Sequence, residues 1–267
     1  MADRPIITLL TDFGWGDGHI GAMKGVILDI NPDSRIVDLA HHIPPHDVMG
    51  AAFVLGQTYM FFPPGTIHVA VVDPGVGGAR KPLVLKAGDY LFVGPDNGVF
   101  TLVLRQEEGV QAHELTEERF HLPRVSQTFH GRDIFAPAAA HLSLEVVPEE
   151  MGPAADIHTL TTLAIPDPVV EGEILVGEVI WVDHFGNLIT NITQEALGAF
   201  APDELIEIEI KGETVRGLKT SYEEGQAGEI IVLWGSAGYL EISLKERNLH
   251  RELGWGRGEK VRIRRRL

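Results

Sequence analysis

Residues 6–30 read IITLLTDFGWGDGHIGAMKGVILDI, a strand pattern followed directly by a helix pattern. Residues 6–10 are β-branched and aliphatic, and residues 11–14 close the run with a turn sequence. Residues 19–30 then place apolar side chains at helical spacing, and Asn31-Pro32 ends that helix. A strand, a turn and a helix in this order are typical of an α/β fold with a parallel sheet.

The same alternation continues to about residue 160. Further strand signals lie at residues 35–39, 66–72, 83–86 and 90–93, and helical signals lie at residues 47–62, 99–104 and 134–144. Strands separated by helices of about 10–15 residues predict a largely parallel sheet with helices packed on it. We therefore predict an N-terminal α/β domain over residues 1–163.

The pattern changes after residue 163. Residues 165–168, Ile-Pro-Asp-Pro, form a stiff connector, and the helical period nearly vanishes beyond them. Strand-like runs with glycine-rich joints, at residues 228–233, 239–244 and 260–264, are typical of a small antiparallel sheet or barrel. We predict a linker at residues 164–170 and a smaller C-terminal antiparallel β-barrel domain at residues 171–267.

Composition excludes several classes of function. The chain has 38 acidic and 22 basic residues, a formal charge of −16, so it repels phosphate backbones and a nucleic-acid partner is not expected. Without cysteine it has no disulfide, no thiolate nucleophile and no cysteine-ligated metal. No window approaches the roughly 18 apolar residues of a membrane span, so we expect a soluble, cytoplasmic protein.

Polar residues follow several of the predicted strands. In an open parallel sheet, ligands bind beyond the carboxyl ends of the strands. One such residue commonly just caps the next helix, but several at one edge indicate a binding site. The residues in these positions are Asp12, His41, His42, Asp73, Asp96 and Asn97.

Residues 73–80 read DPGVGGAR, the densest of these turns. Its glycines let the backbone approach a ligand closely, and Arg80 can complement the charge of Asp73. Arg80-Lys81-Pro82 does not match the Gly-Lys-Ser/Thr of a Walker A loop, and no dinucleotide fingerprint follows the first strand. A nucleotide phosphate is therefore not the expected ligand. A purely structural Asp73–Arg80 ion pair is the alternative.

His130 precedes the helix predicted to begin at Ile134. The positive end of a helix dipole lowers the pKa of such a histidine, and a neutral imidazole can accept a proton from water. A plain hydrogen bond to a backbone carbonyl is equally compatible with the sequence.

A metal site is the weaker interpretation of the other histidines. One segment supplies all of the candidate ligands, and no H-E-x-x-H spacing occurs, so we expect no metal. These candidates are His41, His42, His46 and Asp47.

Two turns of the second domain are candidates for ligand binding. Residues 183–187 read DHFGN, and an aromatic ring beside an amide side chain suits a purine base. Residues 234–239, WGSAGY, form a hairpin sequence of similar kind. Either segment alone could be an ordinary turn.

Six segments together resemble the S-adenosyl-L-methionine (SAM) hydroxide adenosyltransferase family, the hydrolytic relatives of the fluorinating and chlorinating enzymes. The resemblance spans nearly the whole chain. It implies an N-terminal α/β domain, a C-terminal β-barrel and a homotrimer in which the ligand lies between neighbouring subunits. The segments are residues 11–14 (TDFG), 72–77 (VDPGVG), 94–98 (GPDNG), 129–133 (FHGRD), 183–187 (DHFGN) and 235–240 (GSAGYL).

The resemblance also implies a role for individual residues. Asp73, Arg80 and His130 correspond to the set that activates water. Asp12 would hold the ribose hydroxyls, and Asp183 and Ser236 would hold the methionine amino and carboxylate groups. The adenine would lie among Phe185, Asn187 and Tyr222, and Asn97 and Phe129 complete the predicted substrate-binding set.

The implied reaction is hydrolysis of SAM to adenosine and methionine, with SAM as substrate and no cofactor. The halogenating relatives carry tyrosine and threonine in the stretch matching residues 73–76 and serine at the position of Gly131. This chain lacks that threonine and serine, which favours hydroxide as nucleophile. Three alternatives stay open: a non-catalytic binding module for adenosine or SAM, a SAM-dependent chlorinase, and a metal-dependent nucleosidase or phosphatase that uses Asp12, Asp17, His19, His41 and His42.

Overall fold

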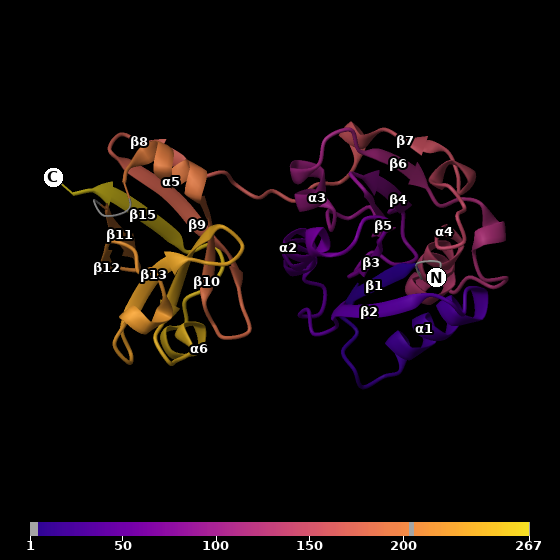
Figure 1. Ribbon diagram of the computed structural model, residues 1–267, viewed down its shortest axis with the longest axis horizontal. Coiled ribbons are helices and arrows are strands. Elements are labelled where there is room, and N and C mark those ends of the chain that lie inside the picture. The colour runs from indigo at the N-terminus through magenta and orange to yellow at the C-terminus, as the bar shows by residue number, and fades with distance from the viewer. Residues whose placement is uncertain (1–4, 203–205, 267) are drawn as a thin grey trace. The chain divides into compact units, whose positions relative to one another are not determined.

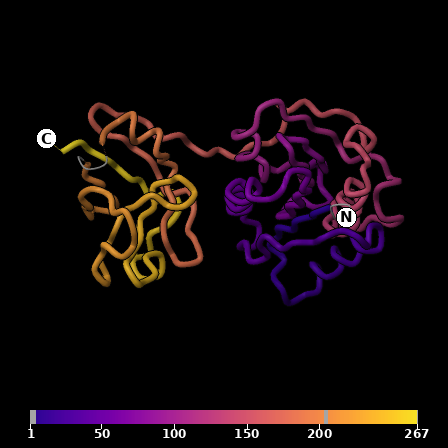
Figure 2. Tube along the Cα trace, in the orientation of Figure 1, coloured from indigo at the N-terminus to yellow at the C-terminus, as the bar shows by residue number. Residues whose placement is uncertain are grey.

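The computed structural model describes residues 5–202 and 206–266. Residues 1–4 of the predicted N-terminal domain, and residues 203–205 and 267 of the predicted C-terminal domain, lie outside the described residues. The chain divides into two compact units, residues 1–163 and residues 164–267. Figure 1 shows the first unit in indigo to magenta and the second in orange to yellow, and Figure 2 traces the same path.

The first unit contains a mixed sheet with strand order β2-β1-β3-β5-β4-β6-β7. Its parallel part is β2 (Arg35–Ala40), β1 (Ile6–Thr11), β3 (Ile67–Val71) and β5 (Tyr90–Pro95). The remaining strands pair antiparallel: β4 (Pro82–Ala87), β6 (Gln111–Glu114) and β7 (Ala154–Ala155). The predicted α/β class is confirmed, and the parallel strands carry the turns singled out in the sequence.

Helices cover both faces of this sheet (Figure 1). The helices α1 (His19–Ile30) and α4 (Ala136–Leu142) pack on one face, and α2 (Val48–Thr58) and α3 (Thr101–Gln106) pack on the other. Side chains alternate along a strand, so Leu9 of β1 joins the core beneath α1 while Leu10 joins the core beneath α2.

Two predicted helices differ from the observed ones at their ends. The helix predicted at residues 47–62 is α2 followed by a 3₁₀ turn at Tyr59–Phe61. The helix predicted from residue 134 begins as a π-helical turn at Gly131–Phe135, which α4 continues. The segment that carries His130 is therefore wound more widely than an ordinary helix start.

The second unit is an antiparallel, nearly closed barrel, which confirms the predicted class. Its strands follow the order β12-β11-β15-β9-β10-β14-β13, and β8 pairs with β9. A parallel bridge between Lys219, which lies three residues after β12, and Leu233 of β13 connects the two edges of this sheet. It also contains α5 (Gln194–Phe200) and α6 (Leu249–Leu253). The strands are β8 (Val169–Glu171), β9 (Ile174–Val182), β10 (Leu188–Thr193), β11 (Ile206–Ile210), β12 (Glu213–Arg216), β13 (Ile230–Trp234), β14 (Tyr239–Leu244) and β15 (Lys260–Arg265).

The alternating pattern of β11 shows how this barrel is filled. Ile206, Ile208 and Ile210 are fully buried, whereas Glu207 and Glu209 lie on the outer side. None of the helices in residues 5–202 and 206–266 combines the length and apolar composition of a membrane span.

Gly94 of β5 allows the parallel strands to approach each other. A Cβ at this position would lie 2.4 Å from the carbonyl oxygen of Ala70 in β3 and 3.0 Å from Cζ of Phe100. By contrast, a Cβ at Gly25, on the exposed side of α1, would meet no atom within 4 Å.

We predict that Gly94→Ala lowers the free energy of unfolding by about 1–3 kcal/mol, because β3 and β5 must separate. The control Gly25→Ala should raise it by about 0.5–1 kcal/mol, since alanine favours the helix. Denaturant unfolding followed by circular dichroism measures both. Equal stability of the two variants would contradict the packing assigned to Gly94.

Candidate active site

A cavity of about 240 Å³ lies at the carboxyl ends of the parallel strands. Asp12 follows β1 and Asp73 lies two residues beyond β3; because β1 and β3 are paired in parallel, their ends meet at one edge. Phe129 and His130 reach the same cavity from the segment before α4. Four predicted site residues are thus brought together, and the other lining residues are Phe13, Pro45, His46, Val71, Val76, Thr128 and Gly131.

Behind this cavity a buried guanidinium joins Asp73 to His130. Arg80 Nε donates to both carboxylate oxygens of Asp73, at 3.1 and 3.0 Å, and Nη2 donates to Oδ2 at 2.5 Å. The same Nη2 lies 2.6 Å from Nδ1 of His130. The Arg80 and Asp73 side chains are only 9% and 5% exposed. A buried ion pair adds little stability by itself, so this arrangement suits a chemical role better than a structural one.

The contact with Arg80 determines which nitrogen of His130 carries the proton. A guanidinium can only donate hydrogen bonds, so Nδ1 must accept and the ring proton lies on Nε2. Burial, followed by the positive charge of Arg80, lowers the pKa of His130 below its ordinary value. The predicted direction is confirmed, and its causes are burial and Arg80.

Asp133 holds the segment that carries His130. Its side chain is fully buried, and it accepts hydrogen bonds from the backbone N–H of Ser126 at 2.8 Å and from Arg132 Nε at 2.6 Å. The segment before α4 is therefore held in place by Asp133.

Asp12 and Asn97 have different environments. The Asp12 carboxylate is half-buried and accepts a hydrogen bond from the backbone N–H of His46 at 2.8 Å. Asn97 does not line the cavity. Its Nδ2 donates to the Val72 carbonyl at 2.8 Å and its Oδ1 accepts from the Val99 N–H at 3.2 Å, so it supports the residue before Asp73.

The predicted site residues of the second unit lie in two turns and a 3₁₀ segment. The Asp183 carboxylate accepts from the N–H of Asn187 at 2.8 Å and from its Nδ2 at 3.0 Å. Phe185, in the same turn, is 72% exposed. Ser236 is exposed in the hairpin between β13 and β14. Phe185 and Ser236 thus present aromatic and polar surface, whereas Asn187 is buried beneath the Asp183 carboxylate that it contacts.

Tyr222 is held by a residue that the sequence analysis missed. Its hydroxyl donates to Oε1 of Glu241, which also accepts from Ser243 at 2.9 Å. Burial and the neighbouring Glu241 raise the pKa of Tyr222 above its ordinary value. Glu241 is buried in β14, and a glutamate within a predominantly apolar strand is the signal that could have revealed it.

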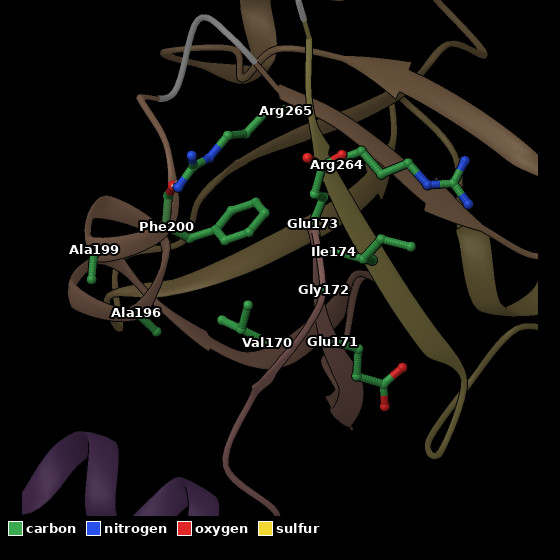
Figure 3. A pocket seen from close by; sticks show the side chains of 10 residues that line it. All are labelled: Val170, Glu171, Gly172, Glu173, Ile174, Ala196, Ala199, Phe200, Arg264 and Arg265. Atoms are coloured by element: carbon green, nitrogen blue, oxygen red, sulfur yellow. The ribbon is translucent and has the colours of Figure 1, made fainter.

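A hollow of about 830 Å³ in the second unit has a different character, because none of the predicted site residues lines it (Figure 3). Arg265, in the wall of this hollow, donates a hydrogen bond to the backbone carbonyl of Phe200, and its guanidinium lies over the aromatic ring of Phe200. Among residues 5–202 and 206–266, no group of three or more histidine or acidic side chains is placed to hold a metal ion.

Comparison with known proteins identifies the family. Residues 7–152 match the N-terminal domain of the SAM hydroxide adenosyltransferases, and residues 177–262 match their C-terminal domain. A Thermus thermophilus protein named (R)-S-adenosyl-L-methionine hydrolase is 37% identical, with 97% of this chain and 99% of the relative covered. An Actinoplanes protein named fluorinase is 28% identical, with 90% and 91% covered.

A solved structure extends the likeness to the fold. The crystal structure of an uncharacterized conserved protein from Thermotoga maritima has a TM-score of 0.89 and 36% identity, covering 97% of this chain and all of that one. Both domains are thus matched in sequence, and nearly the whole chain is matched in structure. The chain belongs to the SAM hydroxide adenosyltransferase family.

Proposed function

We propose that this protein hydrolyses SAM by attack of water on the ribose C5′, giving adenosine and L-methionine. The observation that carries the proposal is the Asp73–Arg80–His130 array behind a cavity that also holds Asp12. The names of its relatives support the same reaction. SAM supplies its own leaving group, so the proposed reaction uses no cofactor.

The chemistry requires few groups. SAM carries a positive sulfonium that departs as a neutral thioether, so no general acid is needed. The site has to align a water molecule behind C5′, and alignment of this kind contributes up to about 7–11 kcal/mol in favourable systems. Charge moves from the sulfonium to the water oxygen, and one proton is released for each SAM consumed.

The hydrogen-bond directions divide the roles between Asp73 and His130. Neutral His130 has no free lone pair, because Nδ1 accepts from Arg80, so its Nε2–H orients the water as a donor. Asp73 keeps its negative charge and one free lone pair, on Oδ1, and it takes the proton. As the C–O bond forms, the water becomes oxonium-like and strongly acidic, so even an ion-paired carboxylate can accept that proton.

We further propose that the enzyme acts as a cytoplasmic homotrimer whose sites lie between subunits. The cavity of the first unit is smaller than the roughly 300–1,000 Å³ of typical ligand pockets, so a second wall is needed. The C-terminal unit of a neighbouring subunit would supply it. Asp12 would bind the ribose beside Phe129, Asp183 and Ser236 would bind the methionine, and Phe185, Asn187 and Tyr222 would enclose the adenine.

The reaction is tested by incubating the purified protein with SAM and following products by chromatography. We expect adenosine, with a rate reduced about 10²–10⁴-fold in Asp73→Asn and unchanged in the surface control Asp89→Asn. Wild-type protein that binds SAM without forming adenosine would contradict hydrolysis and support the binding module. Free adenine or phosphate would indicate a nucleosidase or phosphatase, and 5′-chloro-5′-deoxyadenosine at high chloride would indicate a chlorinase.

The role of His130 is tested by its pH profile. Its pKa is depressed, so activity should fall on the acid side, below pH 6.5, where the protonated ring can no longer accept from Arg80. His130→Asn replaces Nδ1 by an amide oxygen and should stay within about tenfold of wild type, with the acid limb moved to lower pH. His130→Ala should lose about 100-fold. If His130→Asn and His130→Ala are equally inactive, His130 rather than Asp73 takes the proton of the water.

Sites shared between subunits are tested by mixing two inactive variants, Asp73→Ala and Asp183→Ala. A trimeric ring that contains both variants has one interface of three at which neither altered residue occurs, so about a third of its sites are intact. Activity of co-expressed, doubly tagged trimers should therefore recover to about a third of the wild-type value. Mixed oligomers that stay as inactive as their parents would show that each site lies within one subunit.

A further inference from the structure

A chain of hydrogen bonds, exposed at its outer end and buried at its inner end, leads from α1 to the turn that carries Asp12. Lys24 Nζ donates to Asp38 Oδ2 at 2.6 Å, and Asp38 Oδ1 lies 2.8 Å from Nε2 of His41. Nδ1 of His41 lies 2.8 Å from the hydroxyl of Thr11, the last residue of β1. Thr11 is 1% exposed and His41 is 2% exposed.

The direction of each bond follows from the carboxylate. Although burial opposes it, the hydrogen bonds from His41 and Lys24 lower the pKa of Asp38, so this side chain is ionised and accepts. His41 therefore donates from Nε2, and burial lowers its pKa, which leaves Nδ1 free to accept the hydroxyl proton of Thr11. The lone pairs of Thr11 Oγ1 then face the N–H of Phe13, at 3.3 Å.

These contacts hold the residues on either side of Asp12. Thr11 is bound through its hydroxyl and Phe13 through its N–H, and the N–H of Gly14 donates to the His41 carbonyl at 2.8 Å. The backbone of Asp12 is thus fixed between two anchored peptides, while its carboxylate is oriented by the N–H of His46.

Hydroxyl, imidazole and carboxylate also form the nucleophilic triad of many hydrolases. Here the Thr11 hydroxyl is buried and does not line the cavity, so it touches no substrate and cannot act as a nucleophile. A positioning role remains, because the chain of bonds ends on the turn that bears Asp12.

We propose that Asp38, His41 and Thr11 form a positioning relay that fixes Asp12 for binding the ribose hydroxyls of the substrate. This inference rests on the proposed function, because it takes the role of Asp12 from it. The relay sets the affinity for the nucleoside part of SAM and takes no part in the attack on C5′.

The same strand contains a matched control. Thr8 of β1 lies 2.8 Å from Nδ1 of His68, and both side chains are fully buried. Among the described residues Nε2 of His68 has no hydrogen-bond partner, and neither residue lines the cavity. Thr8→Val therefore removes a chemically equivalent bond from β1 without touching the relay.

The test compares Thr11→Val, Thr11→Ser and Thr8→Val by SAM kinetics and by calorimetric titration with adenosine. Thr11→Val should raise both KM and the adenosine Kd roughly tenfold to hundredfold and leave kcat within about twofold, since Asp12 holds the ribose in ground and transition states alike. Thr11→Ser keeps the hydroxyl and should match wild type. Thr8→Val should lower stability while leaving KM and Kd unchanged.

A double-mutant cycle checks that the residues act as a unit. His41→Phe should reproduce the loss of Thr11→Val, and the double variant should bind adenosine no more weakly than either single one. The relay would be overturned if the losses of adenosine affinity in Thr11→Val and His41→Phe were additive. It would also be overturned if Thr11→Val and Thr8→Val changed KM and Kd equally, or if Thr11→Ser bound adenosine as weakly as Thr11→Val. A wild type that binds adenosine but does not hydrolyse SAM would contradict the proposed function alone, because adenosine affinity still tests the relay.

Discussion

The buried guanidinium of Arg80 is the interaction on which the rest of the site depends. It binds Asp73 through two nitrogens and His130 through one of them, and it can only donate. Asp73 is therefore held as an anion and His130 as a neutral ring with its proton on Nε2. One cation thus fixes the charge of one partner and the tautomer of the other, at the edge where a substrate with a positive sulfonium would bind.

The fold brings this array together through strand order. Parallel pairing of β1 with β3 places Asp12 and Asp73 at one edge, and Gly94 allows β5 to pack closely beside β3. Asp133 anchors the segment bearing His130, and the relay beneath Thr11 anchors the turn bearing Asp12. Rigid supports of this kind preserve the alignment that displacement at carbon requires.

Much of this could be predicted from the sequence, because the signals are local. Hydrophobic periodicity revealed the α/β unit and the barrel strands, and residues that follow strands, such as Asp12 and Asp73, were expected at one edge. The supporting contacts were not predictable. Glu241 meets Tyr222, and Thr11 meets His41, only when particular strands and turns are adjacent. The tautomer of His130 likewise depends on Arg80, which is fifty residues away.

In the proposed reaction, water attacks the ribose C5′ of SAM. A single turnover in water enriched in oxygen-18, with the products weighed by mass spectrometry, tests this attack directly. We expect the heavy oxygen in adenosine, at the 5′ hydroxyl, and unlabelled methionine. Unlabelled adenosine, or label in any product other than adenosine, would contradict attack of water at C5′.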